Sequence, residues 1–290
     1  MKTTGLITLE YVNTLIRERP EEIHKGQCGR VLIAAGSVGM AGAAVLAARG
    51  ALRSGAGLVR IAAPRELFNI LQTAVPQATC MDRSISDGFS RRSLEIYGAI
   101  AVGPGMGADE NNYLLIEKIL NNYDGTVVID ADGINSICIY GSDFGAVRRS
   151  RASVILTPHQ GEADRILAAL GEQCVSALGR EKAAELISEK TGAYVLLKGP
   201  GTVVTHVQEM TYINTTGNPG MATGGSGDVL TGVIAATAAS GLSAFDAAKT
   251  GEFIHGMAGN IAAEETGQWG MTAVEIEEAL PAALKRIVGK

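Results

Sequence analysis

The chain has 290 residues, 46% of them hydrophobic and 19% charged, and a formal net charge of −5. It contains neither a run of Lys and Arg nor a basic stripe, which argues against nucleic-acid binding. No apolar run approaches the ~18 residues of a membrane span, and the N-terminus MKTTGLITLE lacks the apolar segment of a secretion signal. We therefore expect a cytoplasmic protein without a membrane span.

Short apolar runs alternate with helical patterns along most of the chain. The runs that predict strands cover residues 31–35, 58–63, 99–103, 126–130, 153–157 and 193–199. Two further runs, 202–207 and 209–214, follow closely and predict a hairpin-like segment with a third strand. The helical patterns cover residues 41–55, 64–72, about 110–122 and 158–171, and from Asp228 onward the sequence is wholly helical.

Apolar strands that alternate with helices predict an α/β fold with a mostly parallel sheet covered on both faces. No linker or repeat divides the chain, so we expect a single domain over residues 1–290. In such sheets, ligands bind outside the carboxyl ends of the strands. Glycine-rich segments follow the predicted strands, which indicates one site at one sheet edge: GSVGMAG (36–42), GPGMG (103–107), DADGIN (130–135), TPHQGE (157–162) and KGPGT (198–202).

A further glycine-rich segment, GGSGD (224–228), lies directly before the apolar run VLTGVIAATAA. A glycine-rich turn at a helix N-terminus favours an anion, because free N–H groups and the positive end of the helix dipole meet there. Two roles are then possible for Asp228. It is either a base that accepts a proton from a substrate hydroxyl, or a helix residue stabilised by the dipole. The segment lacks the GK[ST] of a phosphate-binding P-loop and the context of a Rossmann fingerprint.

The segment NPGMATGGSGDVLTG (218–232) resembles the closing signature of the ribokinase-like superfamily, in the form carried by ADP/ATP-dependent NAD(P)H-hydrate dehydratases. Residues 25–59, 102–107, 128–135, 155–162 and 195–204 resemble the other sequence blocks of that family, in the same order. The resemblance spans about Lys25 to about Gly259. It implies a three-layer α/β/α fold with helices on both faces of a mostly parallel sheet.

The resemblance also implies an activity. Enzymes of this family return the S form of hydrated NADH or NADPH (NADHX or NADPHX) to NADH or NADPH. They phosphorylate the C6 hydroxyl with ADP or ATP and then eliminate phosphate, with Mg²⁺ bridging phosphate oxygens. The family further implies a homo-oligomer, a tetramer, and a separate NAD(P)HX epimerase, because only about 24 residues precede Lys25.

Site residues follow from matching the motifs. Asp228 would be the catalytic base between the two ligands, and Glu162 would reach Mg²⁺ through water or merely occupy the first turn of its helix. Gln160 stands where the family often has proline. The loop is then expected to be less rigid, which weakens the prediction that His159 contacts the cofactor. The residues expected to contact the hydrated cofactor are Ala43, Gly105, His159 and Asp228. Those expected to contact ADP or ATP are Lys198, Gly199, Pro200, Gly201, Thr202, Asn218, Gly225 and Gly227.

Several alternatives stay open at this stage. A kinase acting on a small vitamin-precursor alcohol would use the same GGSGD turn, and a non-catalytic nucleotide sensor would bind there without turnover. Asp130 and Asp132 could face a metal or phosphate, or could cap the turn after their strand. His255 lies within a helical run, where a packing role is expected.

Overall fold

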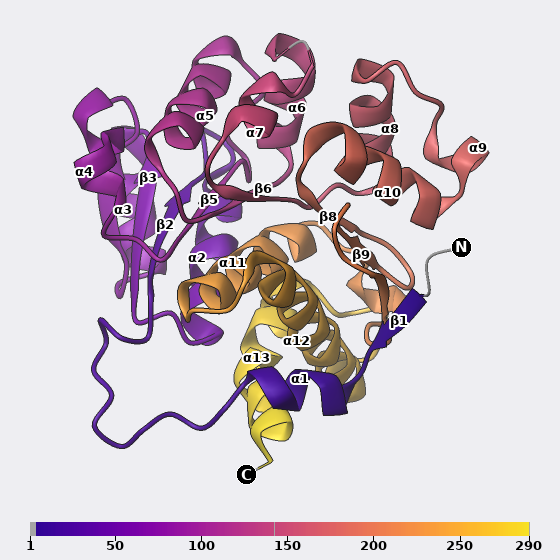
Figure 1. Cartoon of the computed structure of the whole chain (residues 1–290). Helices are drawn as coiled ribbons and strands as arrows, with labels where there is room; N and C mark the ends of the chain where they lie inside the picture. Colours follow the sequence, from indigo (N-terminus) through magenta and orange to yellow (C-terminus); the bar gives the residue numbers. More distant parts are fainter. Residues whose placement is uncertain (1–3, 142, 290) are drawn as a thin grey trace.

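Ten strands form a single sheet in the computed structural model, which describes residues 4–141 and 143–289 (Figure 1). The strands are β1 (Thr4–Ile7), β2 (Arg30–Ala34), β3 (Leu58–Ala63), β4 (Thr79–Asp82), β5 (Ala99–Val102), β6 (Thr126–Ile129), β7 (Ser153–Leu156), β8 (Tyr194–Leu197), β9 (Val203–Thr205) and β10 (Thr211–Asn214). Their order is β1-β10-β9-β8-β7-β6-β5-β2-β3-β4. Only β9 runs antiparallel to its neighbours among these strands, which confirms the mostly parallel sheet and its hairpin-like segment.

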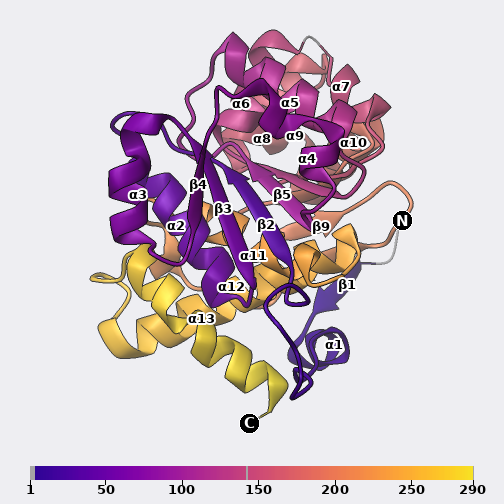
Figure 2. The ribbon, with the colours of Figure 1, turned by 90° about the vertical axis from the view of Figure 1, so that its left-hand side faces the viewer.

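Helices cover both faces of the sheet (Figures 1 and 2). One face carries α1 (Leu9–Leu15), α2 (Ala41–Arg53), α3 (Phe68–Ala74), α11 (Ser226–Ala239), α12 (Ala244–Thr266) and α13 (Ala273–Val288). The other carries α4 (Arg91–Leu94), α5 (Glu110–Asn122), α6 (Asp132–Tyr140), α7 (Gly145–Arg149), α8 (Gln160–Ala169), α9 (Val175–Leu178) and α10 (Arg180–Thr191). The predicted three-layer arrangement is confirmed.

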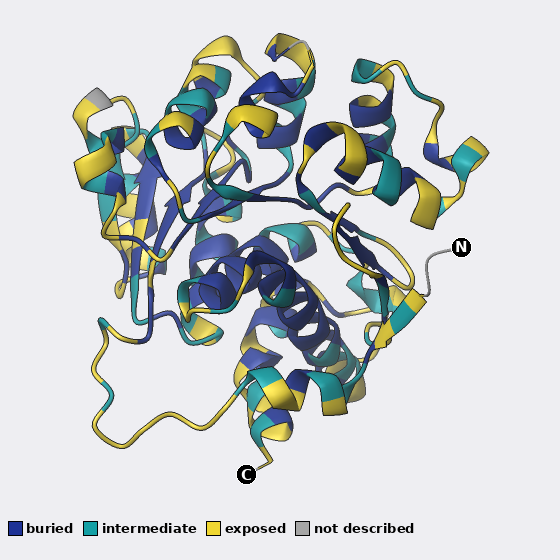
Figure 3. Cartoon of the chain, viewed as in Figure 1, coloured by how far each residue is buried: buried dark blue, intermediate teal, exposed yellow. Residues whose placement is uncertain are grey.

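The strands supply a hydrophobic core to each face, because successive side chains of a strand point to opposite sides. In β2, Val31 and Ile33 pack under α2 and α11, whereas Leu32 and Ala34 pack under the helices of the other face. All four side chains are fully buried, and Figure 3 shows the same burial along the central strands. The uninterrupted apolar runs of the sequence thus serve two cores at once.

Helices α2 and α11 approach each other through glycines rather than through side chains. A Cβ atom at Gly232 would lie 2.0 Å from the Ala47 carbonyl oxygen, and one at Gly50 would lie 2.5 Å from the Val229 carbonyl oxygen. The small residues of the segment that follows Asp228 therefore serve packing inside the chain. Because Ala43 lies on α2 and Asp228 on α11, this contact fixes one predicted site residue relative to the other.

Some elements were not anticipated from sequence. Strand β1 pairs in parallel with β10, with Thr4 opposite Thr211 and Ile7 opposite Asn214. Strand β4 and helix α10 were also not predicted, and the predicted helix over 64–72 divides into a short 3₁₀ turn (Arg65–Leu67) followed by α3. Among the described residues, no helix is both long enough and apolar enough to cross a bilayer.

Candidate active site

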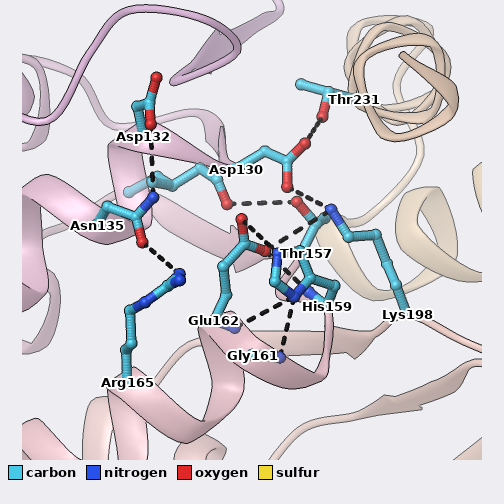
Figure 4. A network of polar contacts seen from close by, with 11 residues as sticks. Asp130, Asp132, Asn135, Thr157, His159, Gly161, Glu162, Arg165, Lys198 and Thr231 are labelled. Carbon is cyan, nitrogen blue, oxygen red and sulfur yellow. Dashed lines mark hydrogen bonds and ion pairs between the residues drawn. The ribbon is translucent and has the colours of Figure 1, made fainter. Parts of the chain in front are cut away.

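Four ionisable side chains meet at the carboxyl edge of the sheet: Asp130, Glu162 and Lys198, which Figure 4 shows, and Asp228, whose charge is coupled to theirs. Asp130 directly follows β6 and Lys198 directly follows β8, while Glu162 and Asp228 occupy the first turns of α8 and α11. These residues are far apart in sequence, but parallel strands place their carboxyl ends at one edge. The predicted single site is therefore assembled from several connections.

Lys198 and Asp130 form the centre of this cluster. Lys198 Nζ donates to Asp130 Oδ1 at 2.7 Å and lies 3.9 Å from Glu162 Oε2. Thr231 Oγ1 donates to the other Asp130 oxygen, Oδ2, at 2.7 Å. Burial by itself would lower the pKa of Lys198, but the charges of Asp130 and Glu162 outweigh burial, and the pKa is raised. Lys198 therefore holds a positive charge at the sheet edge.

The surroundings of Asp228 raise its pKa toward neutral pH. Burial and the negative charge of Asp130 together raise the pKa of Asp228 to about 7, against the opposing effect of the positive charge of Lys198. A base works best when its pKa lies close to the working pH. The environment of Asp228 thus suits proton abstraction better than that of a solvated helix residue.

The first turn of α11 lies against this charged cluster. A Cβ atom at Gly227 would lie 3.2 Å from Lys198 Nζ and 3.7 Å from Asp130 Oδ2, so only glycine leaves that space open. Gly225 precedes the helix with φ +89°, a left-handed conformation that glycine adopts without strain. Because the first N–H groups of a helix have no partner within it, this turn can bind an anion beside the Lys198 ammonium.

His255 lies under the same turn. Its Nε2 is 3.5 Å from Ser226 Oγ, and burial lowers the pKa of His255 to about 4. The imidazole is therefore neutral and packed within α12, as the sequence predicted.

The loop from Lys198 to Thr202 connects β8 to β9. Lys198 N donates to the Pro158 carbonyl oxygen at 2.8 Å, which joins this loop to the TPHQGE segment. Arg180 supports the loop from α10, because its guanidinium donates to the carbonyl oxygens of Leu197 and Pro200. Asn218 lies in the other predicted nucleotide segment, where its Oδ1 accepts from Gly220 N at 2.9 Å and shapes the turn before α11.

His159 and Glu162 cap helix α8 reciprocally. His159 Nδ1 accepts from Gly161 N at 2.9 Å and from Glu162 N at 3.3 Å, while Glu162 Oε2 accepts from His159 N at 2.8 Å. Burial raises the pKa of Glu162 although the positive charge of Lys198 opposes it. The His159 side chain is 55% exposed, so its ring has both a capping role and a face open to a ligand.

The first turn of α2, which carries Ala43, and the loop that carries Gly105 form a continuous wall. A Cβ atom at Gly105, where φ is +60°, would lie 2.8 Å from Ala43 Cβ. Gly36 N donates to the Pro104 carbonyl oxygen at 2.8 Å, and Asp132 Oδ2 accepts from Gly107 N at 2.8 Å. The Asp132 side chain thus anchors a loop, and the predicted cofactor-contacting residues Ala43 and Gly105 lie side by side.

Thr231 is the site residue that sequence reasoning missed. It is fully buried and follows Asp228 by three positions, so both lie on one face of α11. That spacing, which puts a hydroxyl on the same face of α11 as Asp228, is the signal that could have identified it.

The site offers few free ligands to a metal ion. Within the part of the chain that the structure describes, no group of three or more His, Cys, Asp or Glu side chains is placed to hold one. Lys198 and Thr231 already occupy both oxygens of Asp130. The donor set fits Mg²⁺ only when phosphate oxygens supply most of its ligands, which is how Mg²⁺ is usually bound with nucleotides.

Comparison with known proteins identifies relatives of this chain. The family model described as NAD(P)H-hydrate dehydratase matches residues 31–282. The bifunctional NAD(P)H-hydrate repair enzyme Nnr of Thermofilum pendens is 36% identical over 93% of this chain and 52% of its own length, so the chain spans about half the length of this curated relative. A second such enzyme, from Moorella thermoacetica, is 36% identical over 97% of this chain and 54% of its own length.

A solved structure is similar over its whole length. The ADP/ATP-dependent NAD(P)H-hydrate dehydratase of Bacillus subtilis, co-crystallised with ATP and Mg²⁺, is 29% identical with a TM-score of 0.86, covering 98% of this chain and 99% of that chain. The motifs, the ribokinase-like fold and these similarities agree: the chain belongs to the NAD(P)H-hydrate dehydratase family.

Proposed function

We propose that this protein dehydrates the S form of hydrated NADH and NADPH to NADH and NADPH, and consumes ADP or ATP in doing so. The observation that carries the proposal is Asp228, a base with a pKa of about 7 in the first turn of α11. Asp228 belongs to the turn suited to phosphates, and its helix packs against α2, which carries Ala43. Family membership supplies the substrate class.

In the proposed reaction, Asp228 removes the proton from the C6 hydroxyl of the hydrated ring. The hydroxyl oxygen then attacks the terminal phosphorus of the nucleotide and displaces AMP or ADP. The ring nitrogen lone pair expels the new phosphate group, and loss of the C5 proton restores the double bond. Phosphorylation is needed because hydroxide leaves poorly, whereas phosphate leaves well.

The remaining residues bind and orient the nucleotide. The N–H groups of Gly225 and Gly227, with the Lys198 ammonium, stabilise charge on the transferred phosphoryl group. The loop from Lys198 to Thr202 and Asn218 would hold the rest of the nucleotide. Mg²⁺, when bound, would neutralise phosphate charge, and Glu162 is the carboxylate that we propose for a water-mediated contact.

The proposal also includes an epimerase partner and a homotetrameric assembly. Because the reaction accepts one epimer at C6, complete repair of a mixture needs an epimerase, and the relatives named bifunctional agree with such a pairing. A homotetramer is the assembly that the family resemblance suggests, and size-exclusion chromatography with light scattering tests it.

The direct experiment offers purified NADHX and NADPHX with ADP or ATP and follows the near-ultraviolet absorbance of the reduced nicotinamide. We expect absorbance to rise only when nucleotide is present. Stable phosphorylation of a vitamin-precursor alcohol, without any rise for the hydrates, would instead identify a small-molecule kinase.

The role of Asp228 has its own test. Asp228→Asn should lower kcat by roughly 10²–10⁴-fold, the usual effect of losing a general base, while nucleotide binding persists in calorimetry. Asp124→Asn is the matched control, because Asp124 forms only half-exposed ion pairs with Arg91 and Arg151. If the Asp228→Asn variant keeps its turnover, Asp228 is not the catalytic base. Nucleotide binding with no turnover in the unaltered protein would indicate a sensor.

A further inference from the structure

Helix α12 lies alongside residues 214–218, the segment that leads from β10 toward the turn before α11. Two pairs of side chains join the helix to this segment. Glu252 Oε1 accepts from Asn214 Nδ2 at 3.3 Å, and Asn260 Oδ1 accepts from Asn218 Nδ2 at 3.1 Å. The segment is therefore attached to α12 at both of its ends.

The middle of the segment lies against the main chain of the helix. A Cβ atom at Gly256 would lie 2.2 Å from Thr216 Oγ1. The same hydroxyl donates to the Phe253 carbonyl oxygen at 3.1 Å. A side chain at position 256 would therefore push the segment away from α12.

These contacts pair every fourth residue of the helix, 252, 256 and 260, with every second residue of the segment, 214, 216 and 218. Four residues of an α-helix rise about 6 Å, and two residues of an extended chain span about 6.6 Å. Asn214 ends β10, and the backbone of Asn218 is extended, with φ −149° and ψ 165°. Because alternate side chains of an extended chain point to opposite sides, a shift by one residue would turn both asparagines away from α12.

Glu252 also reaches the other connection that is expected to contact the nucleotide. It is 6% exposed, and α12 packs against β8 and β9 on the face of the sheet opposite α10 (Figure 1). Asn214 N donates to the Thr202 carbonyl oxygen at 2.9 Å. Burial raises the pKa of Glu252, whereas hydrogen bonding with Thr202 and Asn214 lowers it. The loop that ends at Thr202 and the 214–218 segment thus meet at this carboxylate.

We propose that Glu252 and Asn260 are positioning residues for nucleotide binding, which hold the 214–218 segment in register on α12. They act through Asn214 and Asn218 and so set where the turn before α11 begins. The inference rests on the proposed function, which assigns Asn218 to the nucleotide. The proposed contacts of the hydrated cofactor lie elsewhere, on α2 and on the loop after β5, so the effect should be confined to the nucleotide.

The test measures Kd for ADP and ATP by calorimetry and KM for NADHX by absorbance. Glu252→Ala and Asn260→Ala should each raise Kd for the nucleotides roughly three- to tenfold, the usual effect of one lost hydrogen bond. KM for NADHX should change less than twofold. Glu252→Gln and Asn260→Asp keep an acceptor oxygen for the asparagine amides of the segment, and both should return Kd to within twofold of the unaltered protein.

Glu277→Ala is the matched control. Glu277 is another fully buried carboxylate, on the neighbouring helix α13, but it pairs with Arg49 at 3.0 Å. Its loss should lower stability in urea titration and leave Kd for the nucleotides unchanged. Urea titration of every variant reports the fold, and Asn260, which is only half-buried, provides the test if Glu252→Ala does not fold.

The outcomes separate this inference from the proposed function. If the unaltered protein binds nucleotide but restores no hydrate, the proposed function fails, and Kd in the alanine and conservative variants still decides the inference. The inference fails if Kd stays within twofold in the alanine variants, or if Glu277→Ala raises it equally. It also fails if Kd for the nucleotides and KM for NADHX rise together, or if Glu252→Gln and Asn260→Asp do not recover binding. An unaltered protein that binds neither nucleotide would overturn both.

Discussion

Thr231 Oγ1 donates a 2.7 Å hydrogen bond to Asp130 Oδ2, and the other oxygen of the same carboxylate accepts from Lys198. Thr231 is fully buried and lies one turn after Asp228 on α11. The helix that carries Asp228, the proposed base, therefore also fixes the carboxylate that holds the Lys198 ammonium. Any movement of α11 changes the positions of Asp228 and of this cation together.

Thr231→Val tests this arrangement. The substitution leaves a buried carboxylate oxygen without its donor, so we expect the free energy of unfolding to fall by about 1–3 kcal/mol. We also expect kcat/KM to fall, because Asp130 is then free to reorient and to release Lys198. Urea denaturation and steady-state kinetics measure the two effects. Thr231→Ser restores the hydroxyl and should recover both; failure of serine to do so would locate the effect in packing.

Activity should depend on pH through Asp228. The carboxylate must be ionised to accept a proton, and burial raises its pKa to about 7. With nucleotide saturating, kcat/KM for NADHX should rise about tenfold per pH unit below 7 and level off above it. Asp130→Asn removes a negative charge that raises this pKa, so the acid limb should move to lower pH. A limb that stays in place would exclude coupling between the two carboxylates.

Asp228→Asn should stabilise the fold. The raised pKa means that the folded chain holds the Asp228 proton more tightly than the unfolded chain does, for which the ordinary value is 3.8. Ionisation therefore destabilises the folded state increasingly between these two values, and the effect is complete above about pH 7. At pH ~8 the variant should gain about 1–3 kcal/mol in urea titration, with little gain at pH ~4. A gain that is the same at both pH values would point to a cause other than charge.

The contact between α2 and α11 should not tolerate a side chain. Gly232→Ala would place Cβ 2.0 Å from a backbone oxygen of α2, so the helices must separate. We expect a loss of about 2–4 kcal/mol in the free energy of unfolding, by analogy with other disruptions of core packing. Gly42→Ala is the control within a helix, because nothing lies within 4 Å of its added Cβ. There, alanine should stabilise the helix by about 0.5–1 kcal/mol.

The sequence predicted the central strands because their apolar runs are buried on both faces, and its helical patterns predicted α2, α3, α5, α8, α11, α12 and α13. Strand β1 escaped prediction because only four residues pair, and their partner β10 lies about 200 positions later. Strand β4 is an edge strand whose residues are exposed or half-buried, so its pattern is weak. Helix α10 is mostly polar, with a narrow buried face centred on Ala183, Ala184 and Ile187.

The candidate site was predictable in its location but not in its internal contacts. Glycine-rich turns after strands pointed to one sheet edge, and the structure brings Asp228, Lys198 and His159 to that edge. Sequence left open whether Asp130 faces a metal or caps a turn; in the structure its side chain binds Lys198 and Thr231 instead. Such a pairing joins residues 68 and 101 positions apart, and no local pattern carries that information.

The backbone contact at Gly50 and Gly232 also limits how this protein can adapt. Where two helices meet through main-chain atoms, no rotamer change or small substitution can adjust their separation. The distance between Ala43 and Asp228 is thus set by the backbone path of the two helices. New substrate preferences would have to arise in the connections beyond the strand ends, where insertions and exchanges leave that distance unaltered.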